Sequence, residues 1–149
     1  MDKNEIRFKG KKSPLSNLFI LSEGLRYKDT FFNCSEQAYQ WEKSLFHGKV
    51  DLARQILHEQ NPYTQMRLGH TIKENQNWTK QKANFMREIL KYKLINCKEY
   101  RESLKQSQCY PIIEDTNNSF WGRGKDEKGQ NQLGVLHCEL RALSRICEN

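Results

Sequence analysis

The helical spacing of apolar residues limits the fold of this chain more than any other feature of its sequence. The spacing recurs in one segment near Val50, in another from about Trp78 to Ile95, and in a closing one with leucines at positions 133, 136, 140 and 143. Two shorter helices are expected, one between an Asn-Pro pair and Gly69 and one over residues 98–105. Side chains three or four positions apart share a helix face and can be buried together. The sequence therefore predicts a predominantly α fold of the α+β class.

Short strands are expected near the start of the chain and before its last loop. Glycines and a proline break residues 5–32 into apolar pieces that are typical of strands and turns. The pieces are Ile6–Phe8, Leu18–Ile20, Leu25–Tyr27 and Thr30–Phe32. A further strand is predicted at residues 110–114, where Pro111 favours an edge position. Because no repeat or long linker divides the chain, we expect a single domain over residues 1–149.

Composition narrows the classes of function. The formal net charge of +7 comes from scattered lysines and arginines, which suit a phosphorylated small molecule or a nucleic acid as partner but equally suit simple solubility. The five cysteines form no C-x-x-C pair and have no metal-ligand spacing, so we expect reduced thiols and no metal. No segment has the length and apolarity of a signal peptide or a membrane span. These features predict a soluble, cytoplasmic protein.

The segment Asn33–Lys43, N-C-S-E-Q-A-Y-Q-W-E-K, places an acid, an amide and an amine on one helix face. Glu36, Gln40 and Lys43 stand at i, i+4 and i+7. The opposite face carries Ala38, Trp41 and Leu45, which is the set that a helix is expected to bury. The polar face then either contacts water or lines a cleft.

The start of this helix has two alternative interpretations. Asn33 followed by Glu36 fits a capping box, in which the glutamate side chain bonds back to the cap. If Ser35 is the cap instead, Glu36 is the first helical residue and its carboxylate is available for other chemistry.

The stretch of residues 121–134 is a second candidate site. Its glycines at positions 122, 124, 129 and 134 lack the strand-turn-helix context of a dinucleotide site. They fit a long turn in which glycines supply positive φ angles. Trp121, at the start of this loop, can stack on a base or pack into the core.

These segments together resemble the NADAR family, which includes the YbiA-like N-glycosidases acting on early riboflavin-pathway intermediates. The resemblance runs along nearly the whole chain. It is carried by the S-E-x-x-x-Q-x-x-K helix, by W-G-x-G at Trp121–Gly124 and by G-x-N-x-L-G at Gly129–Gly134, in this order. Shorter matches include the turn around Asn17, Leu68-Gly69, Trp78, Tyr92-Lys93 and Ile113-Glu114.

The resemblance implies hydrolysis of an N-glycosidic bond at a phosphorylated ribose, without a cofactor. The implied substrates are 5-phosphoribosylamino-pyrimidine metabolites or ADP-ribosylated guanine in nucleic acid. Glu36 matches the motif glutamate and is the candidate acid/base. Lys43 matches the motif lysine, which is expected to attack C1 and form a Schiff base with the opened sugar. Because a lysine amine is normally protonated at neutral pH, Lys43 must be desolvated or lie near another positive charge to act in this way.

The other matched positions suggest binding roles. Asn17 and Asn131 are candidates for hydrogen bonds to the ribose or the base, Gln40 lies on the motif face, Trp121 can stack on the base, and Trp78 is either pocket wall or core. The candidates for the phosphate are Lys9, Lys11, Lys12, Arg67 and Arg123.

Two positions depart from the family pattern. Asn118 stands where the family commonly has an acid three residues before its W-G, so a second carboxylate role would pass to Asp115 or Glu114, or be absent. His70 also replaces a frequent arginine. Two other functions therefore remain open, a nucleotide-binding module without catalysis and a basic nucleic-acid-binding protein. The oligomeric state is not determined by the sequence.

Overall fold

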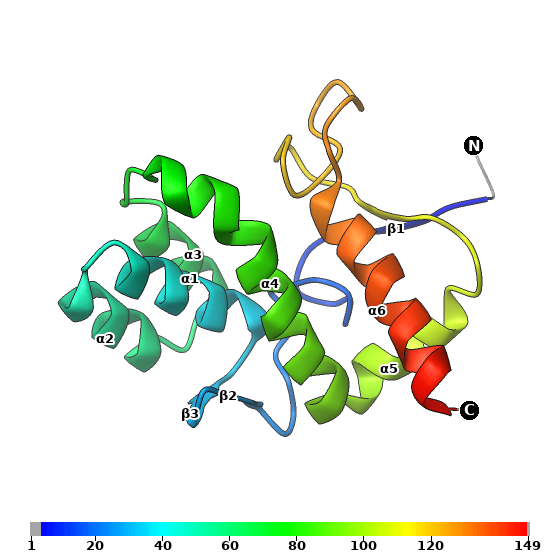
Figure 1. The fold of residues 1–149 in the computed structure, drawn as a ribbon, viewed down its shortest axis with the longest axis horizontal. Helices are drawn as coiled ribbons and strands as arrows, with labels where there is room; N and C mark the ends of the chain where they lie inside the picture. The colour runs from blue at the N-terminus through cyan, green and yellow to red at the C-terminus, as the bar shows by residue number, and fades with distance from the viewer. Residues whose placement is uncertain (1–3, 149) are drawn as a thin grey trace. The chain divides into compact units, whose positions relative to one another are not determined.

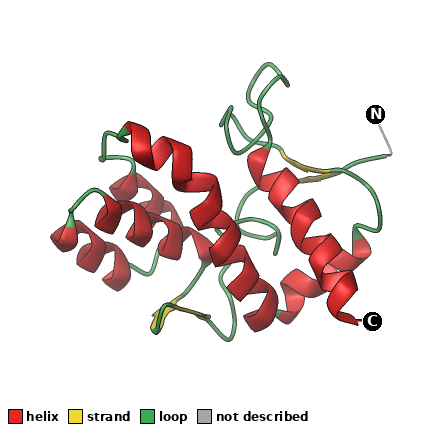
Figure 2. Cartoon of the chain, in the orientation of Figure 1, coloured by secondary structure: helices red, strands yellow, loops and turns green. Residues whose placement is uncertain are grey.

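The computed structural model describes residues 4–148. Within this range the chain forms six helices and four short strands, which confirms the predicted α+β class dominated by helices (Figure 2). Contacts divide the chain into two compact units, which are described separately. The central unit is Asn17–Cys97, and the terminal unit joins the residues up to Ser16 with those from Lys98 onward. The expectation of a single domain over residues 1–149 stays a prediction.

Four helices form most of the central unit (Figure 1). The helix α1 packs against each of the other three, so it is the central helix of this unit. The bounds are α1 (Ser35–Phe46), α2 (Val50–His58), α3 (Pro62–Gly69) and α4 (Gln76–Asn96). All four were expected from the sequence. The asparagines at positions 61 and 75 cap α3 and α4 by accepting hydrogen bonds from backbone N–H groups, which moves the start of α4 two residues ahead of the predicted Trp78.

A β-hairpin completes the central unit. Its strands β2 (Leu25–Tyr27) and β3 (Thr30–Phe32) pair antiparallel, and β2 also contacts α4. Lys28 and Asp29 have φ angles of 50° and 58°, as the tight two-residue turn of a hairpin requires. The strand expected at Leu18–Ile20 was wrong. This stretch is a loop, and the loop places the carbonyl oxygen of Asn17 3.0 Å from the amide nitrogen of Glu36 at the start of α1.

The terminal unit combines a two-stranded parallel sheet with two helices. The strands β1 (Ile6–Phe8) and β4 (Ile112–Glu114) pair in parallel, so the strand predicted near Pro111 is confirmed in a shorter form. The helices are α5 (Lys98–Gln106) and α6 (Gln132–Glu148), both expected from the sequence. His137 on α6 is fully buried, where Nδ1 accepts a hydrogen bond from the Tyr100 hydroxyl and Nε2 donates one to the Leu15 carbonyl, each 2.7 Å long.

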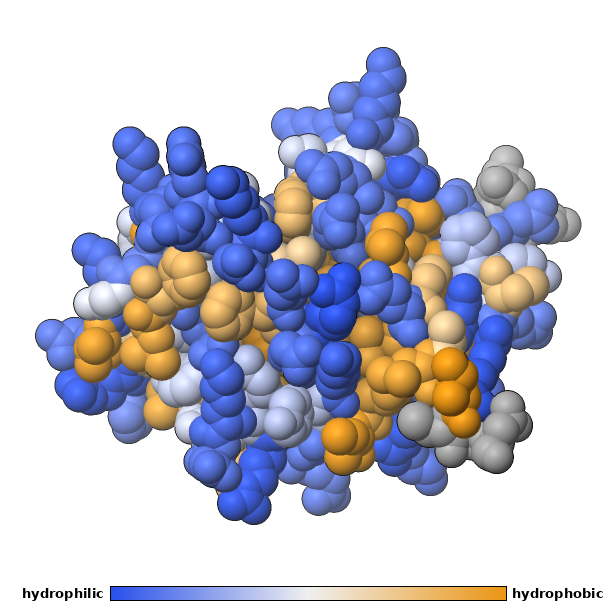
Figure 3. All heavy atoms as spheres, viewed as in Figure 1, coloured by the Kyte–Doolittle hydropathy of each residue, from blue (hydrophilic) through white to orange (hydrophobic). Residues whose placement is uncertain are grey.

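Hydrophilic side chains cover most of the face in Figure 3, with apolar side chains in several groups between them. Within the described residues no helix is both long and apolar enough to cross a bilayer. Cys34, Cys97, Cys109 and Cys138 are free thiols, and the side chain of Cys147 lies outside the description.

Candidate functional site

The polar face of α1 is buried. The exposed fractions are 8% for Glu36, 2% for Gln40 and 5% for Lys43, whereas Leu45 is 38% exposed and Trp41 only partly buried. The expectation that Ala38, Trp41 and Leu45 form the buried face holds for Ala38 and was wrong for Leu45. Because α1 is surrounded by three helices, its polar residues lie inside the unit, where each polar atom needs a partner.

The carboxylate of Glu36 takes no part in capping the helix. The N-cap is Cys34, so both predicted caps, Asn33 and Ser35, were wrong. The reciprocal hydrogen bond of the expected capping box comes from the next residue instead, since Gln37 Oε1 accepts from the backbone N–H of Asn33 at 2.7 Å. This shift by one residue leaves the Glu36 carboxylate for another partner.

That partner is Gln40. Its Nε2 donates to Glu36 Oε1 at 2.8 Å, and its Oε1 is buried without a hydrogen-bond partner among the described residues. Gly69 at the end of α3 makes room for this amide, because a Cβ on Gly69 would lie 1.7 Å from Gln40 Oε1. Burial raises the pKa of the Glu36 carboxyl, while the Gln40 hydrogen bond and the charge of Lys43 oppose the rise. Burial therefore shifts Glu36 toward its protonated form.

Lys43 meets the condition that the sequence sets for a nucleophilic amine. It is 5% exposed, and its ammonium forms neither a hydrogen bond nor an ion pair in the part of the chain that the structure describes. Burial lowers the pKa of Lys43. The carboxylate of Glu74 opposes this effect, the ammonium of Lys82 adds to it, and Glu36 opposes it weakly. Burial and the charge of Lys43 in turn lower the pKa of His70.

A histidine connects α1 to the segment before α4. His47 Nδ1 donates to the Lys43 carbonyl oxygen at 2.7 Å, and its Nε2 accepts from the backbone N–H of Asn75 at 3.1 Å. The neighbouring residue, Glu74, forms an ion pair of 3.0 Å with Lys82 on α4. These contacts hold one negative and one positive group in the neighbourhood of Lys43.

A second polar network supports the start of α1. The hydroxyl of Ser35 donates to Asn17 Oδ1 at 2.9 Å, and Lys93 Nζ lies 3.5 Å from the same hydroxyl. Lys93 is fully buried, which lowers its pKa to about 8. Burial raises the pKa of the Cys34 thiol to about 12. The amide oxygen of Asn17, a candidate ligand of the ribose, is thus engaged within the protein.

Trp78 belongs to the core of the central unit. Its side chain is fully buried and its ring packs against those of Tyr39, Phe46 and Phe85, with centroids 5.0 to 5.5 Å away. The indole nitrogen has no hydrogen-bond partner among the described residues. Of the two roles considered for this tryptophan, burial favours core over pocket wall.

Three of the other candidate residues, Asn118, Trp121 and Asn131, lie in the terminal unit. Asn118 is exposed, and its Oδ1 accepts hydrogen bonds from the backbone N–H groups of Phe120 at 2.9 Å and Trp121 at 2.7 Å. Trp121 is half-buried and packs edge-on against Phe120. Asn131 is buried and bridges to β4, accepting from Glu114 N–H and donating to the Ile112 carbonyl, each at 2.9 Å. The polar groups of both asparagines therefore organise the loop itself.

The glycines of this loop mainly permit close packing. Gly124 alone among the loop's four has the positive φ that was expected of them, at 72°. A Cβ would lie 2.6 Å from Thr116 Oγ1 at Gly122, 2.5 Å from a carbonyl oxygen at Gly129 and 1.9 Å from the Ile112 carbonyl oxygen at Gly134. Three of the four motif glycines therefore let backbone segments approach one another.

The candidate phosphate-binding residues are divided between the two units. Lys9, Lys11 and Lys12 are exposed in the terminal unit, and Arg123 is half-buried in its loop. Arg67 belongs to the central unit, where it is exposed and donates to Thr64. The two candidates for a second carboxylate in place of Asn118 have partners within the protein. Asp115 forms an ion pair with Arg7 at 3.2 Å, and Glu114 accepts a hydrogen bond from Thr116 at 3.1 Å. No group of three or more potential metal ligands occurs among residues 4–148.

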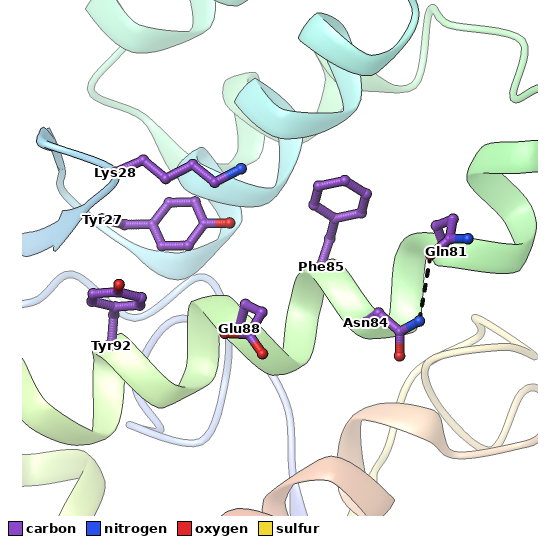
Figure 4. Close-up of a pocket in the computed structure, with 7 residues that line it drawn as sticks. All are labelled: Tyr27, Lys28, Gln81, Asn84, Phe85, Glu88 and Tyr92. Carbon is purple, nitrogen blue, oxygen red and sulfur yellow. Dashed lines mark hydrogen bonds between the residues drawn. The ribbon is translucent and has the colours of Figure 1, made fainter.

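The central unit also contains a pocket of about 270 Å³ that includes none of the predicted residues (Figure 4). In the figure, Lys28 extends from the hairpin past the Tyr27 ring toward Phe85 on α4. Its ammonium pairs at 2.8 Å with the buried carboxylate of Glu42 and lies 5.5 and 5.6 Å from the two ring centroids. The lining residues are Tyr27, Lys28, Gln81, Asn84, Phe85, Glu88 and Tyr92.

Comparison with known proteins decides the family. The model of the NADAR domain matches residues 4–144. This chain belongs to the NADAR family. The N-glycosidase YbiA of Escherichia coli K12 is 31% identical over 110 residues, which are 72% of this chain and 67% of that protein. The N-glycosidase Npun_R5314 of Nostoc punctiforme is 30% identical over 123 residues, or 79% of this chain and 78% of the relative. The NMR structure of E. coli YbiA superimposes with a TM-score of 0.81 at 26% identity, covering 99% of this chain and 89% of that one.

Sequence reasoning missed the contacts of several polar residues in the central unit of this NADAR domain. His47, Glu74, Lys82 and Lys93 stand in no pattern that predicts chemistry, and their contacts come from residues 8 to 58 positions away. A lone polar residue in a helix most often faces water, so the sequence offers no signal for them. Lys93 was noted only as part of the family resemblance.

Proposed function

We propose that this NADAR protein is an N-glycosidase that cleaves the bond between ribose C1 and a nitrogen in a phosphorylated ribosyl substrate. Its substrate is a 5-phosphoribosylamino-pyrimidine or ADP-ribosylated guanine. The relatives named N-glycosidase support the reaction type. The observation that carries the proposal is the burial of the Lys43 side chain on the same helix face as the buried Glu36, with no ion pair to Lys43 among residues 4–148.

Burial prepares both groups for the first step. It favours the uncharged amine of Lys43 and the protonated form of Glu36, which are the forms that a nucleophile and a general acid require. The Lys43 lone pair forms a bond to C1 while the C1–N bond of the substrate breaks. The leaving nitrogen takes the proton of Glu36, so the base departs neutral and Glu36 becomes a carboxylate.

The sugar is then released through an imine. The Glu36 carboxylate takes a proton from Nζ and returns it to the ring oxygen as the C1–O bond opens, which leaves an iminium between Lys43 and C1. Water adds to C1 and gives its proton to Glu36. Glu36 then passes this proton to Nζ. The C1–Nζ bond breaks while the C1 hydroxyl proton returns to Glu36, which frees the sugar and restores the neutral amine and the protonated acid.

Gln40 keeps the acid in place during this cycle. Its Nε2 holds Glu36 Oε1 at 2.8 Å, so the other carboxyl oxygen is left to exchange protons with the substrate. Because Gln40 is itself fixed against Gly69, the direction of the Glu36 carboxyl is set before substrate binds.

Trapping of the imine tests the proposal. The protein is mixed with each substrate class, and released base or ADP-ribose is measured with and without borohydride. We expect product from one substrate and a borohydride-dependent sugar adduct on Lys43. The adduct should vanish in Lys43→Met and persist in Lys73→Ala, since Lys73 is an exposed lysine that serves as the matched control.

Other outcomes are equally informative. Product without an adduct, or an undiminished adduct in Lys43→Met, would overturn the role of Lys43. Binding of both substrates without product would identify the protein as a binding module. Affinity for DNA that falls steeply with salt, without turnover, would instead indicate a nucleic-acid-binding protein.

A further inference from the structure

The pocket of about 270 Å³ between the β-hairpin and α4 has the walls of a binding site for a flat molecule. Three aromatic side chains line it, Tyr27 from β2 and Phe85 and Tyr92 from α4. The rings of Tyr27 and Tyr92 meet edge to face, with centroids 5.3 Å apart and an interplanar angle of 82°. Aromatic walls of this kind hold planar ring systems by stacking and by edge contacts. The lining therefore favours an aromatic ligand.

Contacts inside the central unit fix these walls in place. Phe85 packs against Trp78 and Phe46, with ring centroids 5.0 and 5.8 Å away. Tyr27 is 2% exposed, and its hydroxyl donates to the buried carboxylate of Glu42 at 3.0 Å. Binding to walls that are already ordered costs little side-chain entropy. The volume of the pocket lies just below the usual range for ligand pockets, which suits a molecule of one or two rings.

Both charged residues of the lining are paired with an opposite charge. Lys28 Nζ lies 2.8 Å from a carboxylate oxygen of Glu42, whose side chain is 5% exposed. The carboxylate of Glu88 pairs with Lys91 at 3.0 Å. An ionic ligand would give up hydration here and would have to compete with a partner that is already in place. The charges of the pocket therefore favour an uncharged ligand over an anion or a cation.

Two amide side chains supply polar groups at the rim. Gln81 and Asn84 are exposed, and Asn84 Nδ2 lies 3.5 Å from Gln81 Oε1, at the long limit of a hydrogen bond. Asn84 Oδ1 also accepts from Arg87 at 2.6 Å. Asparagine and glutamine amides bind ring edges that present a donor beside an acceptor, as adenine does. Figure 4 shows both amides beside Phe85, so one ligand can contact the ring and an amide together.

We infer that this pocket binds an uncharged, planar heteroaromatic molecule of nucleobase size. Its ring packs on Phe85 between the aromatic walls, and its polar edge is bound by the amides of Gln81 and Asn84. The inference is independent of the proposed function, because the lining includes neither Glu36 nor Lys43.

Ligands matched in shape test the preference for an uncharged molecule. Benzamide, benzoate and benzamidinium share one ring and one planar substituent, and at neutral pH they are uncharged, negative and positive. Each of them, and adenine, is titrated into the full-length ¹⁵N-labelled protein, and the shifts of the backbone amide signals of the lining residues give the affinity. We expect adenine and benzamide to bind, with benzamide at least about fivefold tighter than either ion. Equal or tighter binding of benzoate or benzamidinium would overturn the inference.

Two substitutions test the wall and the rim. Phe85→Leu removes the stacking surface and should weaken adenine binding about tenfold. Its control is Phe31→Leu, at a hairpin residue that is 63% exposed and outside the lining, and adenine affinity should not change there. Asn84→Ala should weaken adenine binding about threefold, and its exposed position keeps the test valid if Phe85→Leu does not fold. Absence of shifts with all four ligands, or unchanged adenine affinity in both variants, would overturn the inference.

Discussion

The polar face of α1 and the glycine-rich loop of residues 121–134 differ in how they use their polar groups. In the loop, the side chains of Asn118 and Asn131 are engaged with the loop's own backbone and with β4. On α1, Gln40 Oε1 is buried without a hydrogen-bond partner in the described part of the chain, and the buried side chain of Lys43 forms no ion pair there. A buried polar group without a partner costs free energy that a folded structure normally avoids. Of these two regions, only α1 therefore has a buried side-chain polar atom without a partner among the described residues.

Gly134→Ala should have the largest effect and would test the structural role of the loop. The added Cβ would lie 1.9 Å from the backbone oxygen of Ile112, which cannot move without separating α6 from β4. We expect the free energy of unfolding to fall by at least about 3 kcal/mol. Urea unfolding measures it, with Val135→Ala, at an exposed neighbouring position, as the control. A loss below about 1 kcal/mol would contradict the prediction, because it would show that the backbone near Gly134 can shift to accept a methyl group.

Lys93→Met tests whether the buried Lys93 amine makes the stability of the central unit depend on pH. Since the folded pKa of Lys93 is about 8 and an unfolded lysine titrates near 10.4, the native state binds fewer protons between these values. Wild-type stability should therefore rise with pH from about 8 to 10.4, and this rise should disappear in the variant. Below pH 8 the variant should be more stable by about 3 kcal/mol, because it buries no charge. Thermal unfolding across this pH range is the measurement, and equal slopes in both proteins would contradict the burial.

Gly69→Ala adds a methyl group next to α1, as Gly134→Ala does in the loop, and tests the packing of Gly69 against Gln40. Here the added Cβ meets the end of the Gln40 side chain, which can rotate away at the loss of its bond to Glu36. A drop of about 1 to 2 kcal/mol in unfolding free energy is expected, together with a fall in kcat. Adding Gln40→Ala should restore part of the stability but none of the activity. If the second change restores nothing, the clash is not with Gln40.

Asn118→Asp should have the smallest effect on stability. An aspartate oxygen can accept the same two backbone hydrogen bonds, so the unfolding free energy should change by less than about 0.5 kcal/mol. Comparison of kcat/KM in the two proteins then tests the acid that the family commonly has at this position. An unchanged value would assign this position to loop structure, whereas a marked rise would give a carboxylate there a role in catalysis.

The sequence predicted the helices well and the environment of the site poorly. The helices α2 and α3 were confirmed, because both follow from local sequence preferences. These are the spacing of Val50, Ala53 and Ile56 in α2 and the Asn-Pro start of α3. Burial of Glu36 and Lys43 could not be read from α1, because it results from three other helices packing around it. The expected strand at Leu18–Ile20 failed for a similar reason: its apolar residues lie in a loop whose backbone holds the start of α1.

The inward-facing charges of α1 also bear on how the central unit folds. The helix α1 exposes part of Leu45 and Phe46 to water and buries three polar side chains, those of Glu36, Gln40 and Lys43. It therefore lacks the apolar face that would stabilise it early in folding. It becomes stable only when α2, α3 and α4 enclose it. The amide hydrogens of α1 should therefore exchange with solvent only when the whole central unit unfolds. Fraying of α1 alone should contribute little to their exchange.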